Sequence, residues 1–171
     1  MNQVLFKNIA RFILLILLQV LIFNNMNLGG YLTPAIYVLF ILLLPQAINK
    51  SMLLILGFMT GLTIDLFLNT PGLHAAATVL MAFSRPGVIR LFFRNLEFSP
   101  DEAPDILKLG LGGFFRYALV LVFIQHIALF VLEVFSFKDI LFTFYRSLLS
   151  SLLTTVLIMA IVLLTTKRKK R

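Results

Sequence analysis

The chain has 171 residues, of which 60% are hydrophobic and 13% are charged, and its mean hydropathy is +1.01. Soluble domains average about 25% charged residues, so this composition excludes an ordinary water-soluble domain. The chain contains no cysteine, which excludes disulfides and thiolate metal sites. These features predict an all-α, polytopic membrane protein that forms one integral membrane domain over residues 1–171.

Six apolar stretches reach or approach the length of a membrane-spanning helix. A helix needs about 20 apolar residues to cross the hydrocarbon core of a bilayer. We predict spans at residues 6–23, 31–44, 52–68, 72–84, 109–135 and 140–166, with a cytoplasmic loop at 85–108. The second and fourth stretches have only 14 and 13 residues. They either extend into neighbouring segments or are broken elements buried inside the bundle.

The basic residues predict the orientation of the spans. The turns after the first and third spans carry no charge, whereas Lys and Arg gather at the other ends: Lys7, Arg11, Lys50, Arg85, Arg90, Arg94, Lys108 and residues 167–171. With six spans and both termini in the cytoplasm, every strong basic cluster lies inside, as the positive-inside rule requires. We expect anionic lipids at Arg90, Arg94 and the run from Lys167 to Arg171, and no nucleic-acid partner.

The stretch GFMTGLTIDLFLNTPGLHAAA, from Gly57 to Ala77, contains an acid inside an apolar span. A carboxylate in a membrane span costs roughly 2.5–3.5 kcal/mol on insertion scales, so another group must offset the cost of Asp65. Gly57, Gly61 and Asp65 are spaced i, i+4, i+8, and they fall within one ~80° sector of a helix. We therefore predict a helix-packing face that points away from lipid, and we assign Gly72 to helix packing as well.

Several other polar residues are predicted to lie at the same depth in the membrane as Asp65. His74 opens the fourth span near the outside, Glu133 lies at the outer edge of the fifth, and Arg146 lies about 6 residues, roughly 9 Å, below the outer surface. Arg146 must pair with an acid or reach the outer head groups. We expect an outer polar cluster of Asp65, His74 and Arg146, with Glu133 or His126 at its margin. Two interpretations stay open: an ion pair that locks the helices, and a ligand or partner site.

The inventory of side chains argues against an enzyme. Two histidines in different spans do not form the His-Glu-x-x-His pattern of a zinc protease. Asp65 has no second intramembrane aspartate with which to form an aspartyl dyad, and the chain has no Gly-x-Ser-x-Gly elbow. We expect no catalytic residue, no metal site and no cofactor.

The pattern Gly61-Leu62-x-x-Asp65, followed by Gly72-x-His74-Ala75, resembles the signature of the rod shape-determining protein MreD family. The resemblance covers essentially the whole chain, and its specific part is the stretch from Gly57 to Ala77. It also extends to Pro34, Tyr37, Pro45 and the continuation into Arg85-Pro86, which is similar to the Bacteroidetes form of the family.

The resemblance implies a non-enzymatic subunit of the bacterial inner membrane that takes part in cell elongation. Such proteins bind the bitopic scaffold MreC, and together they link cytoplasmic MreB filaments to the glycosyltransferase RodA and its partner transpeptidase, so cell shape and peptidoglycan synthesis are the expected processes. The resemblance also implies the six-helix fold of the substrate-binding components of energy-coupling-factor vitamin transporters. Residue by residue, only Gly61, Asp65, Gly72 and His74 carry over. We expect a partner's single membrane helix to dock on the face that carries Gly57 and Gly61.

A vitamin-binding component of a membrane transporter is the alternative function. In that class the first span carries spaced alanines that contact the energising partner. Residues 6–23 contain one alanine, Ala10, and no small-x-x-x-small pattern. A third interpretation, a subunit that binds a lipid or a precursor, overlaps with the scaffold function.

Overall fold

The computed structural model describes residues 2–25, 32–99, 101–134 and 140–166, and within these ranges every regular element is a helix. Five of these helices are long and apolar enough to cross a membrane. The long helices are α1 (Asn2–Leu21), α3 (Lys50–Leu68), α4 (Leu73–Phe92), α5 (Ile106–Val134) and α6 (Ile140–Thr165). The short elements are the 3-10 helices η1 (Phe23–Asn25) and η2 (Ile36–Val38) and the single turn α2 (Leu39–Leu42).

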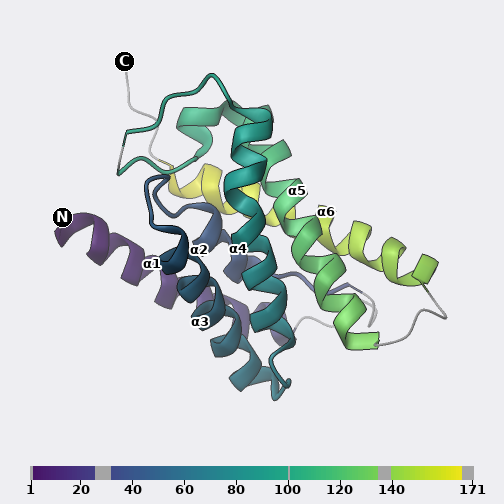
Figure 1. Cartoon of the computed structure of the whole chain (residues 1–171). Coiled ribbons are helices and arrows are strands. Elements are labelled where there is room, and N and C mark those ends of the chain that lie inside the picture. The colour runs from purple at the N-terminus through teal and green to yellow at the C-terminus, as the bar shows by residue number, and fades with distance from the viewer. Residues whose placement is uncertain (1, 26–31, 100, 135–139, 167–171) are drawn as a thin grey trace.

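The long helices form one bundle (Figure 1). Helix α4 lies between α3 and α5, and α5 packs against α6. Helix α1 packs against η2, α2 and α3, so that the two short elements lie inside the bundle. We name the two ends of the bundle by their connections: the turn end carries the α3–α4 turn at residues 69–72, and the loop end carries the α4–α5 loop at residues 93–105.

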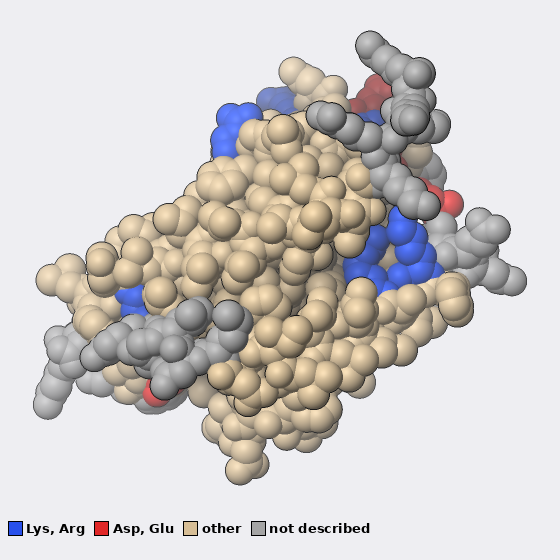
Figure 2. All heavy atoms as spheres, turned by 180° about the vertical axis from the view of Figure 1, so that it is seen from behind, with Lys and Arg blue, Asp and Glu red and all other residues tan. Residues whose placement is uncertain are grey.

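The outer faces of the long helices carry large apolar side chains. Phe6 on α1, Phe58 on α3 and Leu164 on α6 are exposed, as are residues along the whole length of α6. In Figure 2 uncharged residues cover most of the visible face, and Lys and Arg appear only in small patches. An apolar exterior of this extent is typical of helices that face lipid. The fold is therefore that of an all-helical protein suited to crossing a membrane several times.

The middle of the bundle is occupied by a segment that is helical only in part, and we call residues 32–44 the broken segment. Its first four residues have no regular secondary structure, and η2 and α2 follow without a long helix. Residues 34–44 are all buried, the side chains of Ile36, Val38 and Ile41 completely. Irregular backbone at membrane depth needs hydrogen-bond partners from the surrounding protein, because lipid supplies none.

Side chains from the neighbouring helices supply those partners at the turn end. The Gln19 amide nitrogen donates to the carbonyl oxygen of Pro34 at 2.9 Å, and its amide oxygen accepts from the Ile36 backbone amide at 2.7 Å. Two more side chains complete this half: the Thr154 hydroxyl accepts from the Ala35 amide at 3.2 Å, and His126 Nε2 lies 3.1 Å from the Thr33 carbonyl oxygen.

Three consecutive carbonyl groups end the broken segment toward the loop end, and each accepts from a different side chain. The carbonyl oxygen of Leu42 accepts from the Tyr117 hydroxyl at 3.0 Å, and that of Leu43 accepts from Arg11 Nη1 at 3.1 Å. The Leu44 carbonyl accepts from Arg85 Nη2, and Arg85 Nε donates to the Tyr117 hydroxyl oxygen at 2.9 Å. Cationic donors stabilise the carbonyl end of a helix, so this arrangement explains a buried arginine.

The second predicted span, 31–44, is not a membrane-crossing helix. Its described part is a buried broken element, one of the two alternatives that its short length left open. Residue 31 lies outside the described residues, and the rest is not among the helices long enough to cross a membrane. It runs through the bundle from the turn end to Gln46, whose amide donates to the Glu102 carbonyl oxygen in the α4–α5 loop at 2.9 Å. The apolar run predicted a helix because its sequence does not reveal the side chains that satisfy its backbone.

The fourth predicted span, 72–84, extends into the neighbouring segment, one of the two alternatives that its short length left open, and the predicted loop at 85–108 is corrected. Helix α4 continues through Arg85 and Pro86 to Phe92, so Arg90 lies in its last turn rather than on a separate surface helix. A charged residue at position 85 predicted the end of the span, but its guanidinium is buried and hydrogen-bonded inside the bundle. Arg94 lies in the shorter loop that remains, and the basic run at 167–171 lies outside the described residues.

The α4–α5 loop is held by an ion pair. Lys108 Nζ lies 2.9 Å from a Glu102 carboxylate oxygen, and the Ser99 amide donates to the same oxygen at 3.0 Å. The hydrogen bond from Lys108 and that from Ser99 lower the pKa of Glu102 below its ordinary value. Helix α5 then begins at Ile106 and bends at Gly110, whose φ of 70° interrupts the helix near the predicted start at residue 109.

Candidate functional site

The site begins with the glycine face of α3, which packs against α4. A Cβ added at Gly57 would lie 3.0 Å from the Ala82 Cβ. At Gly61 it would overlap the His74 carbonyl oxygen and the backbone of Ala75. The two helices therefore touch backbone to backbone at Gly61, and only glycine fits there.

Asp65 lies one turn further along the same face and caps the next helix. Its carboxylate accepts from the His74 amide at 3.0 Å and from the Ala75 amide at 2.9 Å. These are the N2 and N3 positions of α4, whose own N-cap residue, Gly72, has no side chain with which to cap. A carboxylate is also favoured at the positive end of a helix dipole. The cap is how the fold offsets the cost of a buried acid.

Two side chains complete the shell of Asp65, which is 2% exposed. The Thr70 hydroxyl donates to the carboxylate, and His74 Nδ1 lies 3.0 Å from the same oxygen. A carboxylate only accepts hydrogen bonds, so the proton on the His74 ring that faces Asp65 is on Nδ1. We call Asp65, Thr70 and His74, together with the start of α4, the α3–α4 corner.

Gly72 was predicted to be a helix-packing residue, and this prediction is wrong. A Cβ at this position would meet no atom within 4 Å, so Gly72 makes no close helix contact. Its φ of 85° lies in the left-handed region, which glycine adopts without steric cost. Gly72 is therefore a turn residue that starts α4 in the direction that brings His74 and Ala75 to Asp65.

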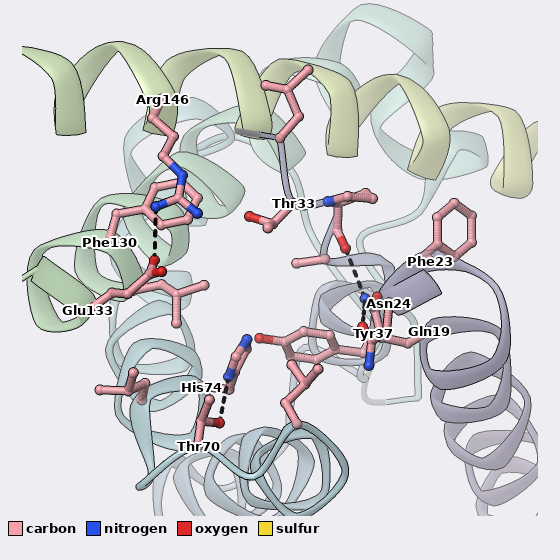
Figure 3. Close-up of a pocket in the computed structure, with 16 residues that line it drawn as sticks. Gln19, Phe23, Asn24, Thr33, Tyr37, Thr70, His74, Phe130, Glu133 and Arg146 are labelled. Atoms are coloured by element: carbon pink, nitrogen blue, oxygen red, sulfur yellow. Dashed lines mark hydrogen bonds and ion pairs between the residues drawn. The ribbon is translucent and has the colours of Figure 1, made fainter. Parts of the chain in front are cut away.

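A cavity of about 280 Å³ opens beside the corner at the turn end (Figure 3). Its walls come from α1, η1, the broken segment, the α3–α4 turn, α5 and α6. The polar side chains that line it are Gln19, Asn24, Thr33, Tyr37, Thr70, His74, Glu133 and Arg146. The His74 ring and the hydroxyl end of Tyr37 point toward each other across it (Figure 3), with ring centroids 6.2 Å apart.

A second charged pair lies on the other side of the cavity. Arg146 Nη1 donates to Glu133 Oε2 at 3.1 Å, and the guanidinium lies over the Phe130 ring at 4.1 Å from its centroid. Figure 3 shows Arg146 reaching from α6 across Phe130 to Glu133 on α5. The pair thus links the last two long helices, and its stacking on an aromatic ring adds a cation–π contact.

The structure places the predicted cluster in two pairs rather than one. His74, Glu133 and Arg146 line the same cavity, and Asp65 lies behind His74. Asp65 binds the start of α4, so of the two acids at its depth Arg146 pairs with Glu133 and not with Asp65. Depth alone cannot tell on which side of a helix a residue lies, and α5 supplies a nearer acid.

His126 has a different role from the one expected. It is completely buried, with Nδ1 2.9 Å from the Val122 carbonyl oxygen and Nε2 facing the broken segment. It does not line the cavity, and it supports the backbone at Thr33. His126 is therefore a support of the broken segment and not a margin of the cluster.

Sequence reasoning missed five polar residues of the cavity wall: Gln19, Asn24, Thr33, Tyr37 and Thr70. Gln19 is the most informative of them, because a buried amide in the last turn of the first apolar helix is as unusual as Asp65. Tyr37 accepts from the Gln125 amide at 3.0 Å, which ties the broken segment to α5. Polar residues in apolar helices are signals that could have found both.

The cavity has the composition of a small-ligand site. Within the described ranges no three His, Cys, Asp or Glu side chains lie together as a metal centre would require. The carboxylates of Asp65 and Glu133 are engaged by a helix start and by a guanidinium. The cavity combines a few fixed polar groups with an apolar lining, as small-ligand sites do.

Comparisons of the chain with protein-family models, with curated proteins and with solved structures find no match.

Proposed function

We propose that this chain is a non-enzymatic subunit of the bacterial cell-elongation complex in the inner membrane, with both termini in the cytoplasm. In this proposal it binds a bitopic scaffold of the MreC kind, and through that scaffold it acts with MreB filaments, RodA and the partner transpeptidase in peptidoglycan synthesis. Anionic lipids contact Arg90 and Arg94 at the loop end.

One observation carries the proposal. The residues that resemble the MreD signature, Gly61, Asp65, Gly72 and His74, meet in a single corner where each has a separate structural task. Gly61 lets α3 touch α4, Gly72 turns the chain, and Asp65 caps α4 while it orients His74. If the chain shares these residues with the MreD family because both have the same fold, the residues are expected to support one another in this way. A chance match of short sequence patterns gives no reason for such an arrangement.

The docking surface on α3 differs from the one expected. Helix α4 covers the face with Gly57 and Gly61, so a partner helix cannot pack there. The outward face of α3 carries Ile55, Phe58 and Met59, which are about half exposed. The proposal therefore assigns the scaffold's membrane helix to this outward face.

Depletion of the protein in its host, with cell shape and co-purifying proteins recorded together, tests the proposal. Rounded cells and a co-purifying bitopic scaffold are the expected result. Because the chain has no cysteine, single cysteines can be placed on α3 without background labelling. A cysteine at Phe58 should crosslink to the scaffold, whereas one at the buried Ile64 should not. Rod-shaped cells without a co-purifying scaffold would contradict the proposal.

The cavity favours a second candidate function, a small-molecule binding component of a membrane transporter. Ligand sites usually occupy about 300–1,000 Å³, and this cavity of about 280 Å³ lies at the lower limit. A vitamin with several rings would therefore fill or exceed it. Loss of uptake of one vitamin on depletion, with normal cell shape, would favour this candidate over the scaffold.

A further inference from the structure

The polar groups of the cavity differ in whether they have hydrogen-bonding capacity left. Gln19 uses its amide on Asn24 and on the broken segment, and the Thr70 hydroxyl proton is directed to Asp65. His74 and Glu133 differ from them. With the ring proton on Nδ1 toward Asp65, the neutral His74 ring presents a lone pair on Nε2. Glu133 binds Arg146 through Oε2, which leaves Oε1 as an acceptor.

His74 and Glu133 face the cavity from its two sides (Figure 3). The charge of Glu133 acts on the His74 ring across the cavity. For the described residues at this end of the bundle, the two carboxylates of Asp65 and Glu133 outweigh the one guanidinium of Arg146. Glu133 and Arg146 balance each other on the cavity wall, and Asp65 behind His74 adds one negative charge to this part of the described structure. The cavity therefore offers two acceptors next to an excess of negative charge, which suits a cationic hydrogen-bond donor.

We propose that the cavity binds a primary ammonium group, which donates hydrogen bonds to His74 Nε2 and Glu133 Oε1. The short carbon chain of the ligand would lie against apolar residues of the wall such as Leu73 and Leu129. A volume of about 280 Å³ fits a ligand of head-group size. Two sources offer this chemistry: the ethanolamine head group of a membrane lipid and a small soluble amine. The proposal does not depend on the elongation function.

Comparing phosphatidylethanolamine with phosphatidylcholine tests hydrogen-bond donation separately from charge. The choline head group is the N-methylated form, which has lost the three N–H donors but keeps the positive charge. The purified full-length protein is placed in nanodiscs that contain both lipids, and the lipids that remain bound are measured by native mass spectrometry. We expect enrichment of phosphatidylethanolamine over phosphatidylcholine on the order of tenfold, as one charge-assisted hydrogen bond supplies. Equal retention of the two lipids would overturn the lipid source.

Two glutamate variants test the site. Glu133→Gln keeps the shape of the side chain but replaces a charged acceptor with a weaker, neutral one, and it should reduce the enrichment several-fold. Glu97→Gln makes the same chemical change on an exposed acid of the α4–α5 loop, and it should leave the enrichment unchanged. An enrichment that is undiminished by Glu133→Gln would overturn the proposed site.

The ¹⁵N resonances of the two histidines distinguish a lipid head group from a soluble amine as the ligand, and the resonance of His126 reports whether the fold is intact. In nanodiscs of phosphatidylcholine alone, we add ethanolamine and follow His74 Nε2 by ¹⁵N NMR, with the buried His126 as the internal control. A shift of His74 with free ethanolamine assigns the site to a soluble amine. A shift only with phosphatidylethanolamine assigns it to the lipid. No shift with either probe, while His126 stays unchanged, would overturn the proposal.

Discussion

The broken segment and the α3–α4 corner both bury polar groups in an apolar molecule, but they satisfy them over different distances along the chain. At the corner, Asp65 reaches the Ala75 amide only 10 residues away. In the broken segment, the Ala35 amide donates to Thr154, which is 119 residues away, and the Leu44 carbonyl accepts from Arg85, 41 residues away. The corner is a local arrangement, whereas the broken segment depends on the assembled bundle.

Because of this difference, the two regions can form at different stages of folding. Two helices joined by a short turn can form the corner before the rest of the bundle is in place. The broken segment lacks its side-chain hydrogen-bond partners until α1, α4, α5 and α6 surround it, so its structure requires the complete fold. We therefore expect substitutions around the broken segment to affect the whole bundle, and substitutions at the corner to affect mainly the packing of α3 on α4.

The largest expected effect is that of Gln19→Leu. Leucine has a similar size, but it removes the partners of the Pro34 carbonyl and the Ile36 amide. Each buried backbone group left without a partner costs about 1–3 kcal/mol. Unfolding by sodium dodecyl sulfate in mixed micelles, followed by circular dichroism, should show the loss of stability.

Asn25→Ala is the matched control for Gln19→Leu. The Asn25 amide also donates to two backbone carbonyl groups, those of Val20 and Leu21, but it does so at an exposed position. We expect a change within about 0.5 kcal/mol for this variant. Equal effects of the two substitutions would show that the broken segment does not depend on Gln19.

The second largest effects are expected from alanine substitutions at three glycines, which test the contact between α3 and α4 at the corner. Gly61→Ala should destabilise the protein by about 1–3 kcal/mol, because the new methyl group overlaps the backbone of α4. Gly57→Ala should cost less, since its nearest neighbour is the Ala82 methyl group at 3.0 Å. Gly87→Ala is the control in α4, with no atom within 4 Å of the new Cβ, and it should be neutral or slightly stabilising. The same unfolding experiment measures all three, and a loss at Gly87 as large as that at Gly61 would contradict backbone contact as the cause.

The same contrast explains what could be predicted from the sequence. The all-helical class, and the long apolar helices such as α3 and α6, were predicted because an apolar run reports directly on a lipid-facing helix. The spacing of Gly57, Gly61 and Asp65 predicted a common face, because helical periodicity is local. The start of α4 was predicted, but its C-terminal end was not, since burial of Arg85 depends on Tyr117 and Leu44 from elsewhere in the chain. For the same reason the sequence could not decide whether Arg146 pairs with Asp65 or with Glu133.

The smallest expected effects are coupling energies, and they test the division of the predicted cluster into two pairs. In a double-mutant cycle, Asp65→Asn and His74→Phe should couple by about 0.6–1.7 kcal/mol, the range found for hydrogen bonds inside membrane proteins. The charge partners Glu133 and Arg146, changed to Gln and Met, should also couple, but by less, because Glu133 is 45% exposed and water weakens the pair.

The double-mutant cycle between Asp65→Asn and Arg146→Met tests whether these residues belong to one cluster or to two separate pairs. These residues belong to different pairs, so their effects on the free energy of unfolding should add to within about 0.3–0.5 kcal/mol. A larger coupling would restore the single cluster that depth along the spans predicts. Additivity would show that the corner and the α5–α6 pair are independent supports, each fixing one acceptor of the cavity: Asp65 orients the His74 ring, and Arg146 holds the Glu133 carboxylate.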